Sequence, residues 1–309
     1  MTTWNGLVAE LDGVPDDVRG DAIQVKLDSE LRRLEEVRQR PVIAYASAFL
    51  QKPGASGGGI SIGYEDINGF MTAVQGLPTD RGLTLLLHTP GGSADAADTI
   101  VAYLRSKFDY IETVVPTYAM SAGTMIALAC DRVVMGRQSQ LGPIDPQMGV
   151  GTRYVSAQAI VDQFERAKAE IGADVVTAHA WAPVLQHLGP ALLVEASNAL
   201  GHAEKTVSRW LEKHMCSDAD EPEEAAAKVA SYFNNASHHL SHGRRIGRDE
   251  AAANGVKIEE LEPSQELQDA VLTAYHVLTI VFEQTPCVKI VTNSRGGRWI
   301  KNQPMQSSQ

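Results

Sequence analysis

The chain has 309 residues, which fits roughly two domains of about 150 residues each, or one large α/β domain with additions. Hydrophobic residues make up 44% and charged residues 21%, as in ordinary globular proteins, so disorder along the whole chain is excluded. Acidic residues outnumber basic ones by 38 to 27, and the formal net charge is −11. Because binding phosphate backbones needs clustered cations, we expect no nucleic-acid partner.

The cysteines and the apolar runs indicate where the protein works. Cys130, Cys216 and Cys287 form no CxxC pair, which indicates a reducing compartment and argues against a cysteine-based zinc site. The N-terminal residues lack the basic start and continuous apolar stretch of a secretory signal. No window approaches the roughly 18 consecutive apolar residues that a membrane span needs. We therefore expect a cytoplasmic protein without membrane insertion.

The first predicted element is an amphipathic helix over residues 15–40, in which apolar residues recur every three or four positions. A strand-like run over 41–50 follows it, and then a glycine-rich loop over 52–63. This loop lacks the Gly-Lys-Ser/Thr ending of a phosphate-binding loop. It predicts a flexible connection or a substrate flap instead.

Strands and helices then alternate as far as residue 136. The expected strands are 83–88, 111–117 and 131–136, and the expected helices are around 69–75, 93–108 and 121–130. This spacing predicts parallel strands joined by right-handed crossovers.

The rest of the chain has a different pattern, because residues 156–240 read almost entirely as helix. A further helix is expected at 265–284, followed by two strands around Gly296. Within the helical stretch, breaks are predicted at Pro183, at Gly189-Pro190 and at the acidic run 217–224.

Two segments supply the residue types of acyl-transfer chemistry. In HTPGGSADAAD (88–98), glycines stand between a strand and a helix, where backbone N–H groups can approach a ligand closely. In PTYAMSAGTMIALACDRVVMG (116–136), Ser121 stands at a strand-to-helix turn, which exposes a hydroxyl next to free N–H groups. Together they offer an oxygen nucleophile and donors for an oxyanion. Taken alone, Ser121 is more often the N-cap of a helix than a nucleophile, but the order of the two segments and their spacing of about 30 residues favour the nucleophile.

TPGG, the Ser121 segment and LGPIDPQ (141–147) together resemble the serine dehydrogenase proteinase family. That family is related to signal peptide peptidase A, the stomatin-operon proteases and the Clp proteolytic subunit. A weaker similarity continues through 241–256. The resemblance implies an α/β fold, a Clp protease/crotonase-like spiral of β-β-α units with helical additions, assembled as a homo-oligomer. It also implies Ser121 as the nucleophile, Gly92 and Ala122 as oxyanion donors, a peptide or protein substrate and no cofactor.

These features predict a division of the chain into four parts. They are a helical arm over 1–40, an α/β core over 41–150, a helical half over 151–285 that completes the core and the oligomer contacts, and a basic strand-like tail over 286–309.

The general base is left open among four residues. Lys205 agrees with the lysine-dependent branch of the related peptidases, and we expect it in the first turn of a helix, where the helix dipole and burial lower the pKa of a lysine. A solvated surface lysine explains it equally. Lys168 reads as a helix-surface residue, and His88 ends a strand without an identifiable carboxylate partner. His242 is the fourth candidate, and its spacing from His238 predicts no metal site, because no Glu-x-x-His or cysteine accompanies them.

The sequence therefore predicts a cytoplasmic serine peptidase that forms an acyl-enzyme on Ser121, with Lys205 as base. Two other functions remain open. One is a crotonase-like acyl-CoA enzyme that uses the same N–H donors, and the other is an inactive oligomeric scaffold of the same fold. A regulatory protein partner is also compatible with the sequence, which does not identify one.

Overall fold

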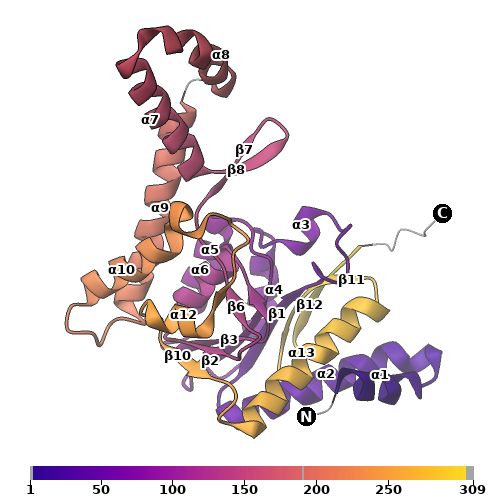
Figure 1. The fold of residues 1–309 in the computed structure, drawn as a ribbon. Helices are drawn as coiled ribbons and strands as arrows, with labels where there is room; N and C mark the ends of the chain where they lie inside the picture. Colours follow the sequence, from indigo (N-terminus) through magenta and orange to yellow (C-terminus); the bar gives the residue numbers. More distant parts are fainter. Residues whose placement is uncertain (1–2, 190, 304–309) are drawn as a thin grey trace, which may run out of the picture. The chain divides into compact units, whose positions relative to one another are not determined.

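The computed structural model describes residues 3–189 and 191–303. The chain divides into two units: unit 1 comprises Met1–Leu141 and Arg245–Gln309, and unit 2 comprises Gly142–Arg244 (Figure 1). The part of the chain that the structure describes contains no helix long and apolar enough to cross a membrane.

Unit 1 is built on a seven-stranded sheet with the order β10-β5-β3-β2-β1-β11-β12. Strands β1, β2, β3, β5 and β10 run parallel to one another, whereas β11 is antiparallel to both of its neighbours, β1 and β12. Their bounds are β1 Val42–Ser47, β2 Leu83–His88, β3 Ile111–Val115, β5 Arg132–Met135, β10 Ile258–Glu260, β11 Cys287–Asn293 and β12 Arg298–Asn302. The parallel pairing predicted for the strands up to residue 136 is confirmed.

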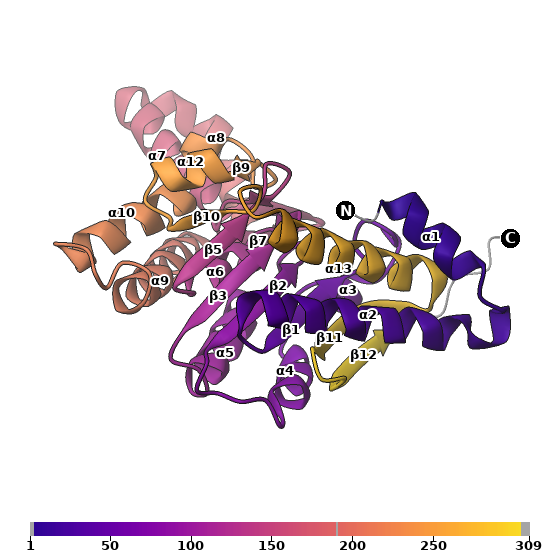
Figure 2. The same cartoon turned by 90° about the horizontal axis from the view of Figure 1, so that it is seen from below.

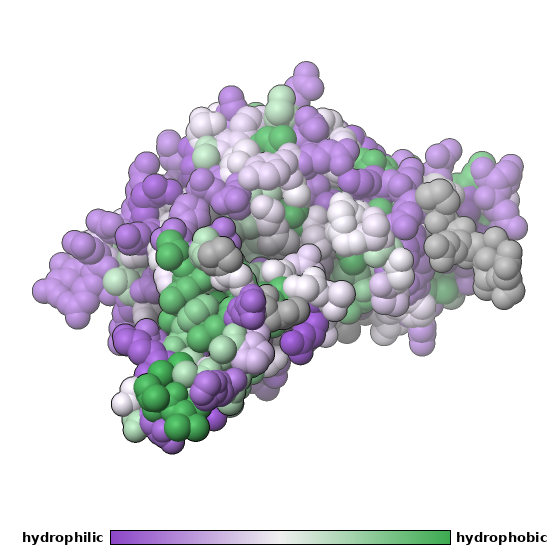
Figure 3. All heavy atoms as spheres, turned by 90° about the horizontal axis from the view of Figure 1, so that it is seen from above, coloured by the Kyte–Doolittle hydropathy of each residue, from purple (hydrophilic) through white to green (hydrophobic). Residues whose placement is uncertain are grey.

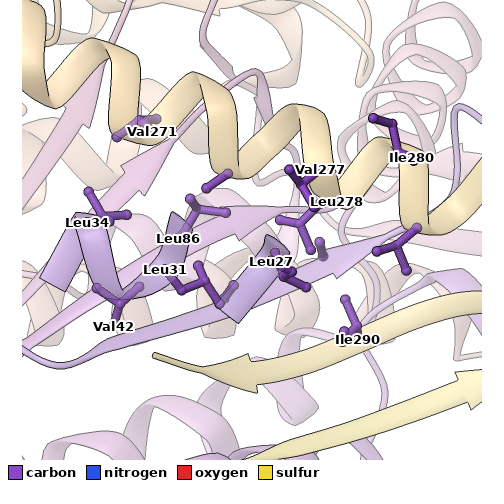
Figure 4. Close-up of a cluster of buried hydrophobic side chains, with 14 of the residues drawn as sticks. Leu27, Leu31, Leu34, Val42, Leu86, Val271, Val277, Leu278, Ile280 and Ile290 are labelled. Atoms are coloured by element: carbon purple, nitrogen blue, oxygen red, sulfur yellow. The ribbon is translucent and has the colours of Figure 1, made fainter. Parts of the chain in front are cut away.

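Helices cover both faces of this sheet, and alternate residues of β1 point to opposite sides. Helices α2 (Asp16–Arg38) and α13 (Gln265–Gln284) lie side by side on one face, and α1 (Trp4–Asp12) packs against α13 (Figure 2). Leucines of α2 and aliphatic residues of α13 meet Val42 and Leu86 of the sheet (Figure 4). On the other face, Tyr45 of β1 stacks on Phe70 of α4 (Asp66–Val74), which packs against α5 (Ala94–Arg105).

The remaining elements of unit 1 are short. A small sheet joins β4 (Tyr118–Ala119), β6 (Gln140–Leu141) and β9 (Ile246–Gly247). Helix α3 (Gly57–Ile60) lies in the glycine-rich loop, α6 (Ala122–Leu128) follows β4, and α12 (Arg248–Ala253) follows β9.

Unit 2 is mainly helical. A hairpin of β7 (Gln147–Val150) and β8 (Arg153–Ser156) leads into α7 (Ala157–Ala173), and the long α9 (Leu192–Lys213) packs against α7 and against α10 (Pro222–Asn234). The other elements are a 3-10 turn η1 (Val175–Thr177), α8 (Ala178–Leu188) and α11 (Ala236–His239). The helices predicted here are present, but Pro183 lies inside α8 and does not break it. The sequence pattern did not predict the β7–β8 hairpin.

Candidate functional site

The two motifs of unit 1 meet at the carboxyl ends of β2 and β3, the edge where parallel α/β sheets place their ligands. Thr89, directly after β2, joins them through its backbone: its N–H donates to the Tyr118 carbonyl at 3.0 Å, and its carbonyl accepts from Met120 N–H at 3.1 Å. The Thr124 hydroxyl donates to the Ala119 carbonyl at 2.7 Å, which closes the same turn. Both loops are therefore tied together immediately before Ser121.

Ser121 has a backbone conformation that L-residues rarely adopt, with φ of 52° and ψ of −118°. It stands between β4 and α6, at the strand-to-helix turn that the sequence predicts. Its side chain makes no capping hydrogen bond to α6. Ser93, Ser156 and Ser264, which precede other helices, have ordinary negative φ, and each side chain accepts a hydrogen bond from an N–H of the first turn. The Ser121 side chain thus does not cap the helix, and the hydroxyl of this partly exposed residue has no hydrogen-bond partner in the described chain.

The two glycines of TPGG each lie against another stretch of backbone, Gly91 against the Ser121 turn and Gly92 against Ile62. Gly91 has φ of 98°, and a Cβ atom there would lie 2.5 Å from the Met120 carbonyl oxygen and 2.7 Å from Ser121 Cβ. Gly92 has φ of 152°, and a Cβ there would overlap the backbone of Ile62. A side chain at position 91 would displace the Ser121 turn, and one at position 92 would displace Ile62, so glycine is required at both.

Two backbone N–H groups in these loops have no hydrogen-bond acceptor in the described chain. Among the described residues, neither the Gly92 N–H nor the Ala122 N–H donates to a protein acceptor. Ala122 is the first residue of α6, where backbone N–H groups have no partner within a helix. Gly92 is exposed, and the carbonyl of Gly91 is engaged by Ile62 N–H at 2.7 Å. Paired free donors of this kind suit a developing oxyanion.

His88 lies at the end of β2 but is fully buried. Its Nδ1 lies 3.0 Å from the Thr117 hydroxyl, and its ring packs against those of Phe49, Tyr118 and Tyr275. Burial lowers the pKa of His88 to about 3, so the imidazole is neutral and a weak base. No carboxylate orients it, and it is best explained as a packed core residue.

The physical reasons for choosing Lys205 are wrong. Helix α9 begins at Leu192, so Lys205 lies far inside the helix and not in its first turn, where the dipole would favour a neutral amine. Its side chain is exposed, so burial does not act on it either. Lys168 is 78% exposed and pairs with Glu165 at 3.4 Å, as expected for a helix-surface residue.

His242 has the carboxylate partner that the other candidates lack. Its Nδ1 lies 2.8 Å from Oδ1 of Asp145, a carboxylate whose side chain is only 2% exposed. The other oxygen of Asp145 accepts from the Gln147 side-chain amide at 2.7 Å. The His242 side chain is 28% exposed, and it lines a cavity of about 490 Å³ within unit 2. Asp145 stands in LGPIDPQ, but the sequence does not predict its contact with His242, because the two residues are 97 positions apart.

Metal and thiol chemistry find no support in the described ranges, 3–189 and 191–303. No group of three or more His, Cys, Asp or Glu side chains there is arranged to hold a metal ion. All three cysteines are buried and reduced. Burial raises the pKa of Cys130 to about 11 and that of Cys287 to about 12, so neither forms the reactive thiolate.

A model of the ClpP-like SDH-type serine proteinases matches residues 16–178, more than half of the chain. The chain belongs to this family. The predicted Clp protease-like α/β fold is thereby confirmed, and membership of a proteinase family supports a serine peptidase.

Two curated relatives come from Methanocaldococcus jannaschii. The uncharacterized proteins MJ0137 and MJ1495 are 42% and 39% identical to the chain over 85 residues. The match covers 28% of this chain and about three tenths of each relative's own length.

Two solved structures are similar to the SDH-type chain at low identity. Both are variants of the 1510-N membrane-bound stomatin-specific protease: one with a serine-to-alanine change, the other with a lysine-to-alanine change and a bound substrate peptide. The first has 17% identity and a TM-score of 0.39, and the match covers 68% of this chain and 79% of the chain in that structure. The second has 16% identity and a TM-score of 0.25, and covers 65% and 83%.

Proposed function

We propose that this SDH-type proteinase hydrolyses peptide bonds through an acyl-enzyme on Ser121. The observation that carries the proposal is the conformation of Ser121, with a positive φ and a side chain that makes no capping hydrogen bond. Backbone strain of about 1–3 kcal/mol at a non-glycine residue persists where the surrounding structure holds it, and it gathers at active sites. The free N–H groups of Gly92 and Ala122 beside this hydroxyl supply the oxyanion site.

In this mechanism Ser121 Oγ attacks the carbonyl carbon of the scissile peptide bond while its proton passes to a general base. The carbonyl oxygen becomes an oxyanion and accepts hydrogen bonds from the Gly92 and Ala122 N–H groups. The C–N bond then breaks, and the base returns its proton to the departing amine. Water attacks the resulting ester in the same way and releases the acid, which regenerates the Ser121 hydroxyl.

We further propose that His242, not Lys205, is the base, on the contacts that each of these residues makes within unit 2, with Asp145 as the positioning residue. The hydrogen bond from Nδ1 to the buried carboxylate of Asp145 fixes the ring tautomer and leaves Nε2 free to accept a proton. The carboxylate also stabilises the imidazolium that forms. None of the other three candidates has such a partner.

A fluorophosphonate probe tests the nucleophile, because it reacts covalently with activated serines. The wild-type chain should be labelled, and Ser121→Ala should not be. Ser106→Ala, which changes an exposed serine at the end of α5, is the matched control and should be labelled at the wild-type rate. A wild-type chain that is neither labelled nor cleaves any peptide would refute the proposal. Acyl-CoA turnover that survives Ser121→Ala would favour the crotonase-like function.

The labelling rate also tests the base. We expect His242→Gln to slow labelling by roughly 100-fold or more, within the range of general-base contributions, and Asp145→Asn to slow it substantially. His238→Gln removes an exposed neighbouring histidine and should leave the rate unchanged. Lys205→Ala should also label normally. The opposite result, with Lys205→Ala inactive and His242→Gln active, would return the role to the lysine.

The proposal includes a cytoplasmic homo-oligomer. Buried, reduced cysteines fit a reducing compartment. Apolar side chains gather over the α7–α8 end of unit 2 (Figure 3), where Val175 and Val176 are 75% and 68% exposed, and such patches are typical of protein contact sites. Light scattering on the purified chain should give a mass several times 33.3 kDa, and a monomer at all concentrations would contradict this part.

A further inference from the structure

Unit 1 contains a buried ion pair that lies outside both the TPGG segment and the Ser121 segment. Lys289 of β11 and Asp66 at the start of α4 have side chains only 1% exposed, and Lys289 Nζ lies 2.8 Å and 3.0 Å from the two carboxylate oxygens. The Tyr45 hydroxyl donates to the same carboxylate at 2.8 Å. Burial lowers the pKa of Lys289, whereas the Asp66 carboxylate raises it. An uncompensated charge here would be costly, so each group depends on the other.

The pair holds one short stretch of backbone from both ends. Lys289 Nζ donates to the Ser61 carbonyl at 2.7 Å, and Asp66 Oδ2 accepts from the Gly63 N–H at 3.0 Å. Ile62 lies between these two anchors and is itself buried. The backbone of residues 61–63 is therefore fixed by two side chains from different elements, Lys289 from β11 and Asp66 from α4.

Ile62 in turn pairs with the loop that carries Gly92. Its N–H donates to the Gly91 carbonyl at 2.7 Å, its carbonyl accepts from the Ser93 N–H at 3.0 Å, and the two segments form a parallel bridge. These two hydrogen bonds flank Gly92, whose own N–H has no acceptor among residues 3–189 and 191–303. The direction of that N–H is consequently set by Ile62, whose position is set by Lys289 and Asp66.

We propose that Lys289 and Asp66 are positioning residues for the oxyanion donor at Gly92, acting through the backbone of Ile62. The inference rests on the proposed peptidase function for its catalytic consequence, but the mechanical connection stands without it. A displaced donor weakens binding of the oxyanion more than binding of the substrate, so kcat falls while KM changes little.

Amide hydrogen exchange tests the connection without any catalytic assay. The double variant Lys289→Met, Asp66→Asn removes both charges, so no lone buried charge remains. We expect the Ile62 and Ser93 amides to exchange roughly ten-fold faster than in the wild type, while the Thr84 amide, which donates to Pro41 O within the sheet, keeps its rate. Unchanged exchange at Ile62 and Ser93 in the folded variant would overturn the inference.

Kinetics test the catalytic consequence. Complete loss of one oxyanion donor costs about 10²–10³ in kcat, so we expect a partial displacement to lower kcat roughly ten-fold in the double variant. KM should stay within about two-fold. The double variant Arg38→Met, Glu112→Gln is the matched control, because it also removes both charges of a buried pair in the same unit, with Arg38 Nε 2.7 Å from Glu112 Oε1. In the described chain, no hydrogen bond joins these two side chains to either motif.

The outcomes separate the two proposals. A wild-type chain without labelling or hydrolysis refutes the peptidase function, while the exchange data still decide the role of the ion pair. An active wild type whose kcat is equally reduced by Arg38→Met, Glu112→Gln shows a general loss of stability and overturns the positioning role. A reduced kcat in the double variant alone, with faster exchange at Ile62, supports it.

Discussion

Ser121→Gly should be more stable than Ser121→Ala, although glycine usually destabilises a fold relative to alanine. With φ of 52° and ψ of −118°, a residue that carries a Cβ is strained at this position, and glycine is not. Neither variant has the hydroxyl, and the wild-type hydroxyl makes no hydrogen bond in the described chain. The comparison of Ser121→Gly with Ser121→Ala therefore isolates the backbone strain.

The magnitude follows from two opposing effects. Relief of a left-handed conformation contributes about 1–2 kcal/mol in favour of glycine. The greater freedom of glycine in the unfolded chain costs about 0.4–1 kcal/mol. Ser121→Gly should thus exceed Ser121→Ala by roughly 0.5–1 kcal/mol in the free energy of unfolding. At Ser197, an exposed position inside α9, the same pair should differ by about 1 kcal/mol in the opposite direction.

Urea denaturation of the four variants measures these differences through their transition midpoints. The sign at position 121, opposite to that at position 197, is the critical observation. If Ser121→Gly is less stable than Ser121→Ala by the amount seen at Ser197, the backbone at Ser121 is unstrained. Ser121 would then lack the main feature on which its proposed role as nucleophile rests.

Three further predictions concern the surroundings of this serine. Gly91→Ala should cost about 2–4 kcal/mol in urea denaturation, because its Cβ meets Met120 and Ser121, whereas Gly76→Ala, at φ of 76° with open space, should cost only about 1–2 kcal/mol. Gly123→Ala should be destabilising because its Cβ overlaps Thr89 Cγ2, and adding Thr89→Ser should recover about 1 kcal/mol or more in a double-mutant cycle. His88 is neutral in the fold and binds a proton only when unfolded below its ordinary pKa of 6.5, so stability should fall by about 1.4 kcal/mol per pH unit from about 6 towards 3. His88→Leu should remove that part of the acid sensitivity, and an unchanged slope would show that His88 is already charged in the fold.

Periodicity was sufficient to predict the layers of unit 1. Apolar residues at helical spacing predicted α2 and α13, which end within a few residues of the expected positions. Short apolar runs bounded by turn residues predicted β2, β3 and β5. These elements are specified by their own residues, because each has a face that can only be buried against the others.

The failures occur where tertiary contacts override local preference. Gly201 lies inside α9, although glycine costs about 1 kcal/mol in a helix, since Val207, Trp210 and Leu211 of the same helix are buried. The helix therefore begins at Leu192, and the expected first-turn position of Lys205 disappears. Likewise, the pairing of His242 with Asp145 joins residues far apart in sequence, and no local pattern reports it. The predicted four-part division of the chain stays a prediction.

The interlock of the two motifs explains why their residues are small. Gly91 lies against the backbone of residues 120–122, and Gly123 lies against Thr89, so each loop fills the space that a Cβ of the other would need. Thr89 adds backbone hydrogen bonds to Tyr118 and Met120 on either side of the contact. A strained residue can be held only by neighbours that cannot relax away from it. Because both loops follow buried parallel strands, neither can move without disrupting the sheet, and this rigidity keeps Ser121 in its positive-φ conformation.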